Sequence, residues 1–382
     1  MLNRVLHLEK IRKQLELAPV VAVLGARQVG KTTLALEIAR LHDGPTHHFD
    51  LEDPTDLAQL QDPKLVLAPL EGLIILDEIQ RKPEIFPLLR VLVDRPDHGA
   101  RFLILGSASP ELLRQSSESL AGRINYYELP GFDLAETGGP AMNDLWVRGG
   151  FPRSFLAPEE EASDLWRRNF IRTYLERDLP ELGIRIPSET LRRFWTMVAH
   201  SHGQVLNLSR LAGSMGVSNT AVRNYIDILC GTYMVRRLPP FLPNIGKRMV
   251  KSPKIYLRDS GLLHTLLGLG NGQEVLAHPV VGASWEGFAL ETVIRLRQAD
   301  ERQCFFWATH NGAELDLLID KGGKRVGYEF KRTSAPGTTK SMHVALESLE
   351  LDELVVVYPG EKQFPLADRV VAMPLVEISS GR

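Results

Sequence analysis

The fold of this chain is indicated by eight consecutive residues, Gly25-Ala26-Arg27-Gln28-Val29-Gly30-Lys31-Thr32. They match the pattern G-x-x-x-x-G-K-[ST], in which the glycines let the backbone wrap a phosphate with its N–H groups. An apolar run at residues 20–24 precedes the loop, and a helical pattern at residues 31–40 follows it. The loop is therefore expected to join a buried strand to a helix whose N-terminus favours anions. The alternative is a glycine-containing surface turn with an incidental lysine.

The residues of this loop have expected roles in holding ATP. Lys31 would reach the β- and γ-phosphates, and Thr32 would supply a hydroxyl to Mg²⁺. The nucleotide-binding residues predicted from the motif are Gly25, Ala26, Arg27, Gln28, Val29, Gly30, Lys31, Thr32 and Thr33.

Further strands are expected beside the first one, at residues 47–51, 73–76 and 102–105. The last two are apolar at every position, which is typical of strands buried on both faces of a parallel α/β sheet. Asp77 and Glu78 directly follow one of them, and ligands of such sheets gather at the carboxyl ends of strands. Asp77 is expected to hold Mg²⁺ through water, and Glu78 to polarise the attacking water. An N-cap aspartate with an acidic first turn is the alternative.

Two more polar residues follow the strand at 102–105. Ser107 is a candidate contact for the γ-phosphate or the attacking water, and capping of the next helix by Ser109 is the alternative, which can hold at the same time. Arg123 is a candidate to stabilise γ-phosphate charge, in its own chain or in a neighbouring subunit. A salt-bridged structural arginine is the alternative for that position.

The middle of the chain has the pattern of a helix-turn-helix. Residues 206–218 indicate a short helix, a tight turn and a new N-cap, after which apolar residues recur at helical spacing. The outer face of the second helix would carry Asn219, Arg223 and Asn224, side-chain types that read base edges in the major groove. The strand-like residues 234–238 would form a wing. Winged-helix domains also serve as protein-binding modules or lids, so DNA binding is one of two interpretations.

A hairpin with opposed carboxylates is expected near the C-terminal end. If Gly322 and Gly323 are the two turn residues, Lys321 faces Lys324, and Asp316 lies opposite Glu329. Two carboxylates roughly 5 Å apart repel each other without a cation. A divalent metal ion would neutralise them, and a hairpin whose charges face water is the alternative.

Asp316 and the following Glu329-Phe330-Lys331 also resemble the D…E-x-K core of restriction-endonuclease-like nucleases. In that core the acids hold Mg²⁺, and the lysine, here Lys331, helps to position the attacking water. The resemblance further implies an acid from the preceding helix. Glu286 and Glu291 are the candidates, and Glu286 is the preferred one.

Over nearly its whole length the chain resembles AAA-type P-loop ATPases that carry a C-terminal DUF4143 module. The motifs that carry the resemblance are GARQVGKTT (25–33), HFDLEDP (48–54), LIILDEIQ (73–80), LILGSAS (103–109), SLAGRI (119–124), GGFP (149–152), TYLERDL (173–179), KIYLRDSGL (254–262), WEGFALE (285–291) and ELDLLI (314–319). The resemblance implies an ATPase domain, a winged-helix-like segment and a restriction-endonuclease-like C-terminal fold. It implies no particular biological role.

Length and composition set the remaining expectations. With 382 residues, several domains are expected: a P-loop ATPase domain at 1–155, a helical winged-helix-like domain at 156–250 and an α/β nuclease-like domain at 251–382. The net charge of −2 gives no overall electrostatic attraction to nucleic acid. The two distant cysteines and the lack of a long apolar run favour a cytoplasmic protein without a membrane span.

The leading functional hypothesis is ATP hydrolysis with Mg²⁺, coupled to action on DNA. It includes possible cleavage at a C-terminal site that holds Mg²⁺ or Mn²⁺ between Glu286, Asp316 and Glu329. The rival is a nucleotide-dependent switch whose C-terminal domain only binds a protein or DNA. A homo-oligomer is possible under either hypothesis.

Overall fold

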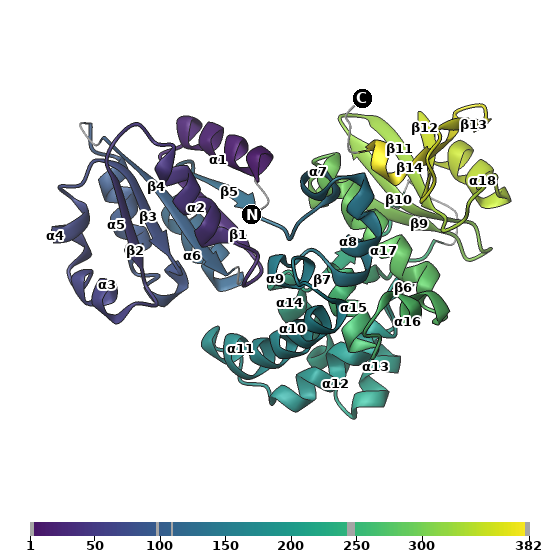
Figure 1. Cartoon of the computed structure of the whole chain (residues 1–382), viewed down its shortest axis with the longest axis horizontal. Helices are drawn as coiled ribbons and strands as arrows, with labels where there is room; N and C mark the ends of the chain where they lie inside the picture. The colour runs from purple at the N-terminus through teal and green to yellow at the C-terminus, as the bar shows by residue number, and fades with distance from the viewer. Residues whose placement is uncertain (1–3, 97–98, 108–109, 243–248, 379–382) are drawn as a thin grey trace. The chain divides into compact units, whose positions relative to one another are not determined.

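The computed structural model describes residues 4–96, 99–107, 110–242 and 249–378. The chain forms two compact units, which Figure 1 traces by residue number. The first consists of Met1–Gly131 with Gly231–Tyr233, and the second of Phe132–Cys230 with Met234–Arg382. Within the described ranges, no helix has both the length and the apolar character needed to cross a bilayer.

The first unit contains a five-stranded parallel sheet with the order β2-β3-β4-β1-β5. Its strands are β1 (Val20–Gly25), β2 (Thr46–Asp50), β3 (Gly72–Asp77), β4 (Ala100–Ser107) and β5 (Ile124–Glu128). The first four confirm the strands expected from the sequence. The edge strand β5 was not expected, because its sequence INYYE is only partly buried and has no apolar run.

Helices and the alternation of strand residues build the core of this unit. The helices are α1 (Val5–Leu17), α2 (Lys31–Arg40), α3 (Pro54–Gln59), α4 (Pro63–Leu67), α5 (Ile85–Val93) and α6 (Pro110–Ser119), with a 3-10 turn at Ile79–Arg81. Alternate residues of β1, Val20 and Ala22 among them, pack in one cluster with Phe86 and Leu89 of α5. Helices α1 and α2 also contact β1 and β4. All six residues of β1 are buried, as a central strand of an α/β sheet requires.

The second unit begins with a helical region. Its helices are α7 (Leu134–Thr137), α8 (Met142–Arg148), α9 (Pro152–Phe155), α10 (Glu160–Thr173), α11 (Leu179–Glu181), α12 (Ser188–Ala199), α13 (Leu208–Met215) and α14 (Asn219–Gly231), with a 3-10 turn at Gly139–Ala141 and a π-helical turn at Tyr174–Asp178. The helix expected after the tight turn is therefore present as α14. Gly216 ends α13 in a left-handed conformation, φ 69°, which glycine adopts without strain.

A small antiparallel sheet follows the helices. Strands β6 (Gln204–Val205), β7 (Val235–Leu238) and β8 (Lys254–Leu257) lie in the order β6-β8-β7. All four residues of β8 are buried, including its charged first residue.

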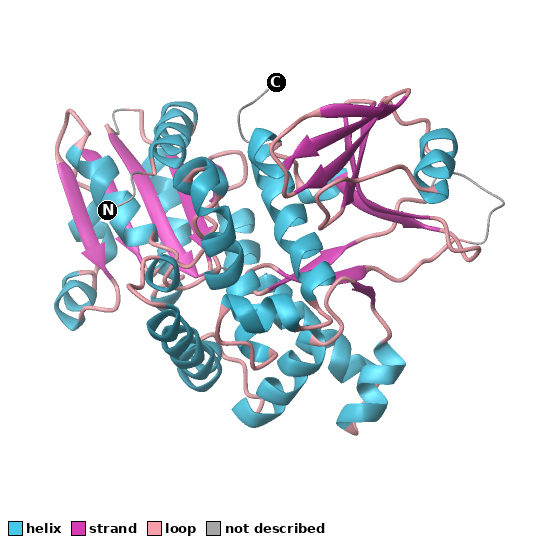
Figure 2. Cartoon of the chain, turned by 45° about the vertical axis from the view of Figure 1, so that its right-hand side comes forward, coloured by secondary structure: helices cyan, strands magenta, loops and turns pink. Residues whose placement is uncertain are grey.

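The C-terminal part combines helices with a six-stranded mixed sheet, whose strands are drawn in magenta in Figure 2. Its helices are α15 (Ser260–Leu266), α16 (Gly272–Ala277), α17 (Val281–Leu296), α18 (Lys340–Ser348) and α19 (Leu375–Ile378), with a 3-10 turn at Glu301–Gln303. Its strands are β9 (Cys304–Ala308), β10 (Glu314–Lys321), β11 (Lys324–Phe330), β12 (Glu353–Tyr358), β13 (Phe364–Ala367) and β14 (Val370–Pro374), in the order β13-β14-β12-β11-β10-β9. The α/β class expected for this region is confirmed.

The predicted hairpin is formed by β10 and β11. Gly322 and Gly323 are its turn residues, and both have positive φ, as the preferred two-residue hairpin turn requires. Lys321 pairs with Lys324, and the pairing continues to Leu317 and Tyr328. The register inferred from the sequence is therefore confirmed.

Candidate nucleotide-binding site and C-terminal acidic cluster

The phosphate-binding loop connects β1 to α2 through two left-handed positions. Gln28 has φ 65° and Gly30 has φ 94°, and left-handed residues in a tight loop can turn backbone N–H groups toward a common anion. Gly25 has a different constraint. A Cβ at this position would lie 2.4 Å from the carbonyl oxygen of Leu129, so the end of β1 accepts only glycine without backbone movement.

Lys31 begins α2, and its side chain lies over the loop. It is 5% exposed, and its Nζ donates hydrogen bonds to the carbonyl oxygens of Gly25, at 3.2 Å, and Ala26, at 3.0 Å. Thr32 and Thr33 follow in the first helical turn with exposed side chains. The lysine is thus held at the loop, where it is available to an incoming phosphate.

Thr32 and Asp77 meet at the carboxyl ends of β1 and β3. The Thr32 hydroxyl donates to Oδ2 of Asp77 at 2.6 Å, and the backbone N–H of Glu78 donates to Oδ1 at 2.9 Å. Burial alone would raise the pKa of Asp77, but the neighbouring His48 imidazole and the hydrogen bond from Thr32 outweigh it and lower the pKa. A hydroxyl beside an ionised carboxylate is a donor set that suits Mg²⁺. These residues therefore fit the metal ion expected with a bound nucleotide.

Glu78 directly follows Asp77 at the end of β3 and is half-buried. Burial raises the pKa of its carboxyl above the ordinary value, although Lys31 and Gln80 act in the opposite direction. The Gln80 amide donates a hydrogen bond to Oε2 of Glu78 and orients the carboxyl. The backbone of Glu78 is left-handed, φ 54°, a strained conformation for a non-glycine residue that is often found at functional sites.

Ser107 ends β4 directly beside the loop, because it pairs with Gly25 in the parallel register of β1 and β4. Its hydroxyl oxygen is buried and has no hydrogen-bond partner among the described residues. A buried hydroxyl without a partner is costly, and a bound group that accepts or donates there removes the cost. Ser109, the alternative capping residue, lies outside the described residues.

Arg123 lies at the other end of the sheet. Its carbonyl oxygen accepts a hydrogen bond from Val20 at the start of β1, whereas the phosphate loop follows the end of that strand. The length of β1 therefore separates Arg123 from the phosphate loop by roughly 17 Å. The guanidinium is paired with both carboxylate oxygens of Asp94, at 2.6 and 2.9 Å. The hypothesis that Arg123 contacts a phosphate in its own chain is therefore corrected, and action on a neighbouring subunit stays a prediction.

Sequence reasoning missed several polar groups at this edge of the sheet. His48 lies on β2 with Nε2 3.9 Å from Oδ2 of Asp77, and this nearby carboxylate raises the pKa of the imidazole. Glu52 follows the same strand and pairs with Arg27 of the loop. The sequence could have indicated these residues, because they lie on or just after the predicted strand at residues 47–51, and the carboxyl ends of parallel strands adjoin the ligand site.

The second unit holds an acidic cluster around the predicted hairpin. The confirmed pairing ends at Leu317 and Tyr328, and the next residues along the two strands, Asp316 and Glu329, are 7% and 4% exposed. Lys331 pairs with Glu329 at 2.8 Å. Burial, with a contribution from the charge of Asp316, raises the pKa of Glu329 above its ordinary value.

A lysine that the sequence did not single out lies inside this cluster. Lys254 of β8 is 4% exposed, and its Nζ pairs with Glu314, with Glu286 at 3.5 Å and with Asp316 at 3.6 Å. Tyr256, two residues along the same strand, donates its hydroxyl proton to Oε1 of Glu286 at 2.6 Å. The two side chains leave β8 on the same face.

The structure separates the two glutamates considered for the metal site. Glu286 on α17 lies beside Lys254, in the cluster that contains Asp316. Glu291, one and a half turns further on, is enclosed by Arg236, Arg258 and Arg295. Burial alone would raise the pKa of Glu291, but Arg236 and Arg258 hold it well below the usual range. Glu291 is therefore part of a buried ion network.

The acidic cluster does not fit a divalent metal ion as it stands. Among the described residues, the carboxylate oxygens of Glu286, Asp316 and Glu329 do not all lie within 4.8 Å of one another. Lys254 pairs with Asp316, and Lys331 pairs with Glu329. An ammonium group beside each of the two carboxylates offsets part of the repulsion from which a metal ion was inferred.

The surface of α14 has the side chains expected for a recognition helix. Asn219, Arg223 and Asn224 are exposed, whereas Val222 and Ile226 are buried on the opposite face. The Ser218 hydroxyl accepts a hydrogen bond from the Ala221 N–H at 3.1 Å and caps the helix.

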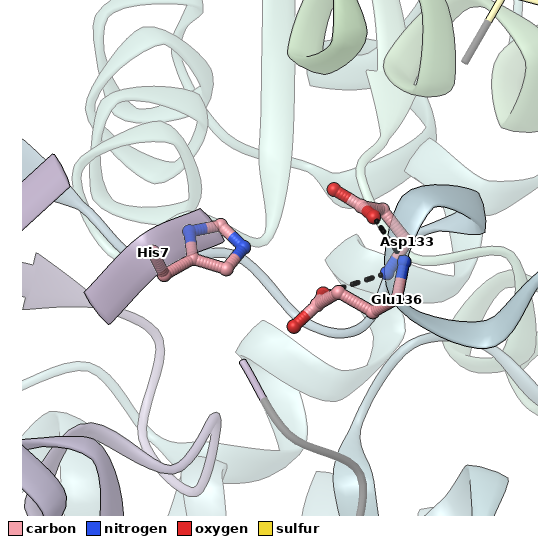
Figure 3. Close-up of side chains that lie close together, drawn as sticks. All are labelled: His7, Asp133 and Glu136. Atoms are coloured by element: carbon pink, nitrogen blue, oxygen red, sulfur yellow. Dashed lines mark hydrogen bonds between the residues drawn. The ribbon is translucent and has the colours of Figure 1, made fainter. Parts of the chain in front are cut away.

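A further acidic pair caps a short helix. Asp133 and Glu136 form a capping box at the start of α7, drawn as dashed lines in Figure 3. His7, also labelled there, belongs to the first unit, where its Nδ1 is 2.6 Å from the Tyr127 hydroxyl. We assign no ligand to these residues.

Comparison with known proteins divides the chain into three segments. An AAA domain matches residues 18–138, and two domains of unknown function, DUF8612 and DUF4143, match residues 139–273 and 281–378. The uncharacterized proteins Rv2008c of Mycobacterium tuberculosis and Mb2031c of Mycobacterium bovis are each 50% identical over 369 residues, which is 97% of this chain and 83% of theirs.

Solved structures show weaker similarity. The Walker-type ATPase PABY2304 of Pyrococcus abyssi aligns with a TM-score of 0.48 and 13% identity, over 70% of this chain and 96% of its own. The RuvB Holliday junction branch migration motor of Thermotoga maritima aligns with a TM-score of 0.29 and 18% identity, over 60% and 89%. Both TM-scores are below 0.5, so the fold assignment rests on the sheet topology and the family match.

Proposed function

Because the chain belongs to the family of AAA-type P-loop ATPases with a C-terminal DUF4143 domain, we propose that its first unit binds ATP with Mg²⁺ and hydrolyses it. The observation that carries the proposal is the contact between Thr32 and Asp77 beside Lys31. A hydroxyl, an ionised carboxylate and an amino group meet there at the end of a parallel sheet, next to a loop shaped for phosphate.

Each residue has a role that follows from its position. The loop N–H groups and Lys31 bind phosphate oxygens, and Thr32 and Asp77 hold Mg²⁺, which neutralises charge on the phosphates when it is bound. Glu78 accepts a proton from the attacking water, a role that a raised pKa favours. Ser107 donates its free hydroxyl to the γ-phosphate or positions the water.

For the second unit, the switch hypothesis has more support than metal-dependent cleavage. Lys254 occupies the acidic cluster, so we assign no cleavage step to Asp316, Glu329 or Lys331. The order α12-β6-α13-α14-β7-β8 suits a winged helix, and the exposed polar face of α14 suits a nucleic-acid contact. We propose that nucleotide state in the first unit controls partner binding by the second, with DNA as the first partner to test.

The test measures DNA binding and DNA integrity together. Fluorescence anisotropy of labelled single- and double-stranded DNA is recorded with no nucleotide, with ADP and with ATP plus Mg²⁺. We expect affinity to change with the nucleotide and to fall in Arg223→Ala, whereas Arg302→Ala, a fully exposed arginine in the C-terminal part, serves as the matched control. Equal affinity in all three states contradicts the switch. Metal-dependent cleavage products on a gel favour the nuclease hypothesis instead.

A further inference from the structure

The acidic cluster of the second unit contains a built-in cation. Three of its carboxylates, Glu286, Glu314 and Asp316, surround the Nζ of Lys254. An ammonium group is a compact positive charge with N–H donors and no acceptor, so carboxylates are its favourable neighbours. The fourth carboxylate, Glu329, is paired separately with Lys331.

Other groups hold Lys254 and its partners in place. The Lys254 Nζ lies 5.7 Å from the centre of the Phe306 ring, within the range of a cation–π contact. Tyr256 fixes Glu286, and the backbone N–H of Phe330 donates to Oδ2 of Asp316 at 3.1 Å. Since β8 is buried and paired on both edges with β6 and β7, the lysine is delivered by a rigid strand.

The lysine and the acids come from different segments of the chain. Lys254 lies in the segment that matches DUF8612, whereas Glu286, Glu314 and Asp316 lie in the DUF4143 domain. A divalent ion bound by these acids would need oxygens at about 2.0–2.6 Å in the space that the ammonium fills. The cluster can hold the lysine or a metal ion, but both together would bring like charges into contact.

We propose that Lys254 is the resident cation of this cluster and excludes divalent metal ions from Glu286, Glu314 and Asp316. The contact places a cation from outside the DUF4143 domain among the acids of that domain. As they stand, the carboxylate oxygens of these three described residues do not all lie within 4.8 Å of one another, and removal of the amino group lets them close around Mg²⁺ or Mn²⁺. This inference concerns the second unit and does not depend on ATP hydrolysis by the first.

The test is Mn²⁺ binding by the full chain without nucleotide, measured by calorimetry and by thermal unfolding. All five tryptophans lie in the second unit, so tryptophan fluorescence reports on the unit that contains the cluster. In the wild-type protein we expect no Mn²⁺ binding that depends on Asp316. In Lys254→Gln we expect a lower melting temperature in EDTA, recovery with Mn²⁺, and one bound Mn²⁺ that is lost in Lys254→Gln/Asp316→Asn.

Two variants serve as controls. Lys254→Arg keeps the positive charge and should not bind Mn²⁺, and Lys251→Gln removes an exposed lysine three residues away and should behave like the wild type. If Lys254→Gln does not fold, Lys254→Met takes its place, because it removes the charge, keeps most of the apolar stem and leaves all three carboxylates intact. The proposal is overturned if the wild type binds Mn²⁺ in a way that Asp316→Asn abolishes, or if the folded variant without Lys254 binds none.

Discussion

Replacing Glu78 by Gln removes the candidate general base and changes little else in the site. Lys31 keeps its contacts with the loop, and the hydrogen bond between Thr32 and Asp77 does not involve Glu78. The new amide oxygen can still accept the hydrogen bond from Gln80. Nucleotide binding should therefore persist while hydrolysis slows.

The expected loss follows from the role of the residue. A positioned general base contributes about 100- to 10,000-fold to a rate, which corresponds to about 3–5 kcal/mol in the activation free energy. Single-turnover hydrolysis of labelled ATP measures the chemical step, and titration with a fluorescent ATP analogue measures binding. Glu84→Gln, at an exposed glutamate of the same unit, is the control and should retain the wild-type rate. Turnover in Glu78→Gln close to that of the wild type would refute the assignment.

Three further predictions concern other residues. Arg123→Ala protein mixed with Lys31→Ala protein should regain part of the ATPase activity that each lacks alone. The first variant supplies an intact loop, and the second supplies an intact arginine. A fully active, strictly monomeric protein contradicts action between subunits. Ser107→Ala should slow hydrolysis more than it weakens ATP binding, since Ser107 pairs with Gly25 at the start of the loop and its buried hydroxyl has no partner among the described residues. Equal loss of both in kinetic and binding assays contradicts the assigned role. Glu291→Gln should destabilise the second unit at neutral pH by about 3–5 kcal/mol, because it breaks a buried ion network. The control is Glu301→Gln, at an exposed partner of Arg236, which should cost less than about 1 kcal/mol. The pKa of Glu291 is lowered in the folded state, so its contribution is present above the unfolded pKa of about 4.3. Urea unfolding followed by tryptophan fluorescence should therefore show the difference between wild type and Glu291→Gln shrinking as the pH falls below about 4, and a pH-independent difference contradicts the reasoning.

Local sequence patterns were enough to predict those elements whose backbone geometry they specify directly. The phosphate loop predicted a strand and a helix, and α2 spans the expected residues 31–40. The Gly322-Gly323 pair set the register of the hairpin, because a two-residue turn allows only one pairing of the residues that flank it. The alternation of apolar residues identified the buried face of α14 in the same way.

Contacts between distant segments were not accessible from these patterns. Lys254 lies 62 positions before Asp316 in the sequence, and no local spacing relates them. The argument from repulsion correctly required a cation beside the opposed carboxylates but did not identify a lysine from another strand. Arg123 failed as a ligand in its own chain for a topological reason, since it precedes its strand and therefore lies at the amino end of a parallel sheet.

Phosphate release from ATP by the purified full chain tests the central claim most directly. The wild-type protein should release phosphate with Mg²⁺ and not with EDTA. Lys31→Ala, which removes the amino group at the loop while leaving the sheet intact, should lose nucleotide binding or turnover in the same assay. Magnesium-dependent turnover in the wild type that disappears in the variant is the result that the structure predicts. Normal turnover in Lys31→Ala, or no turnover and no ATP binding in the wild type, would contradict the assignment of the first unit as an ATPase.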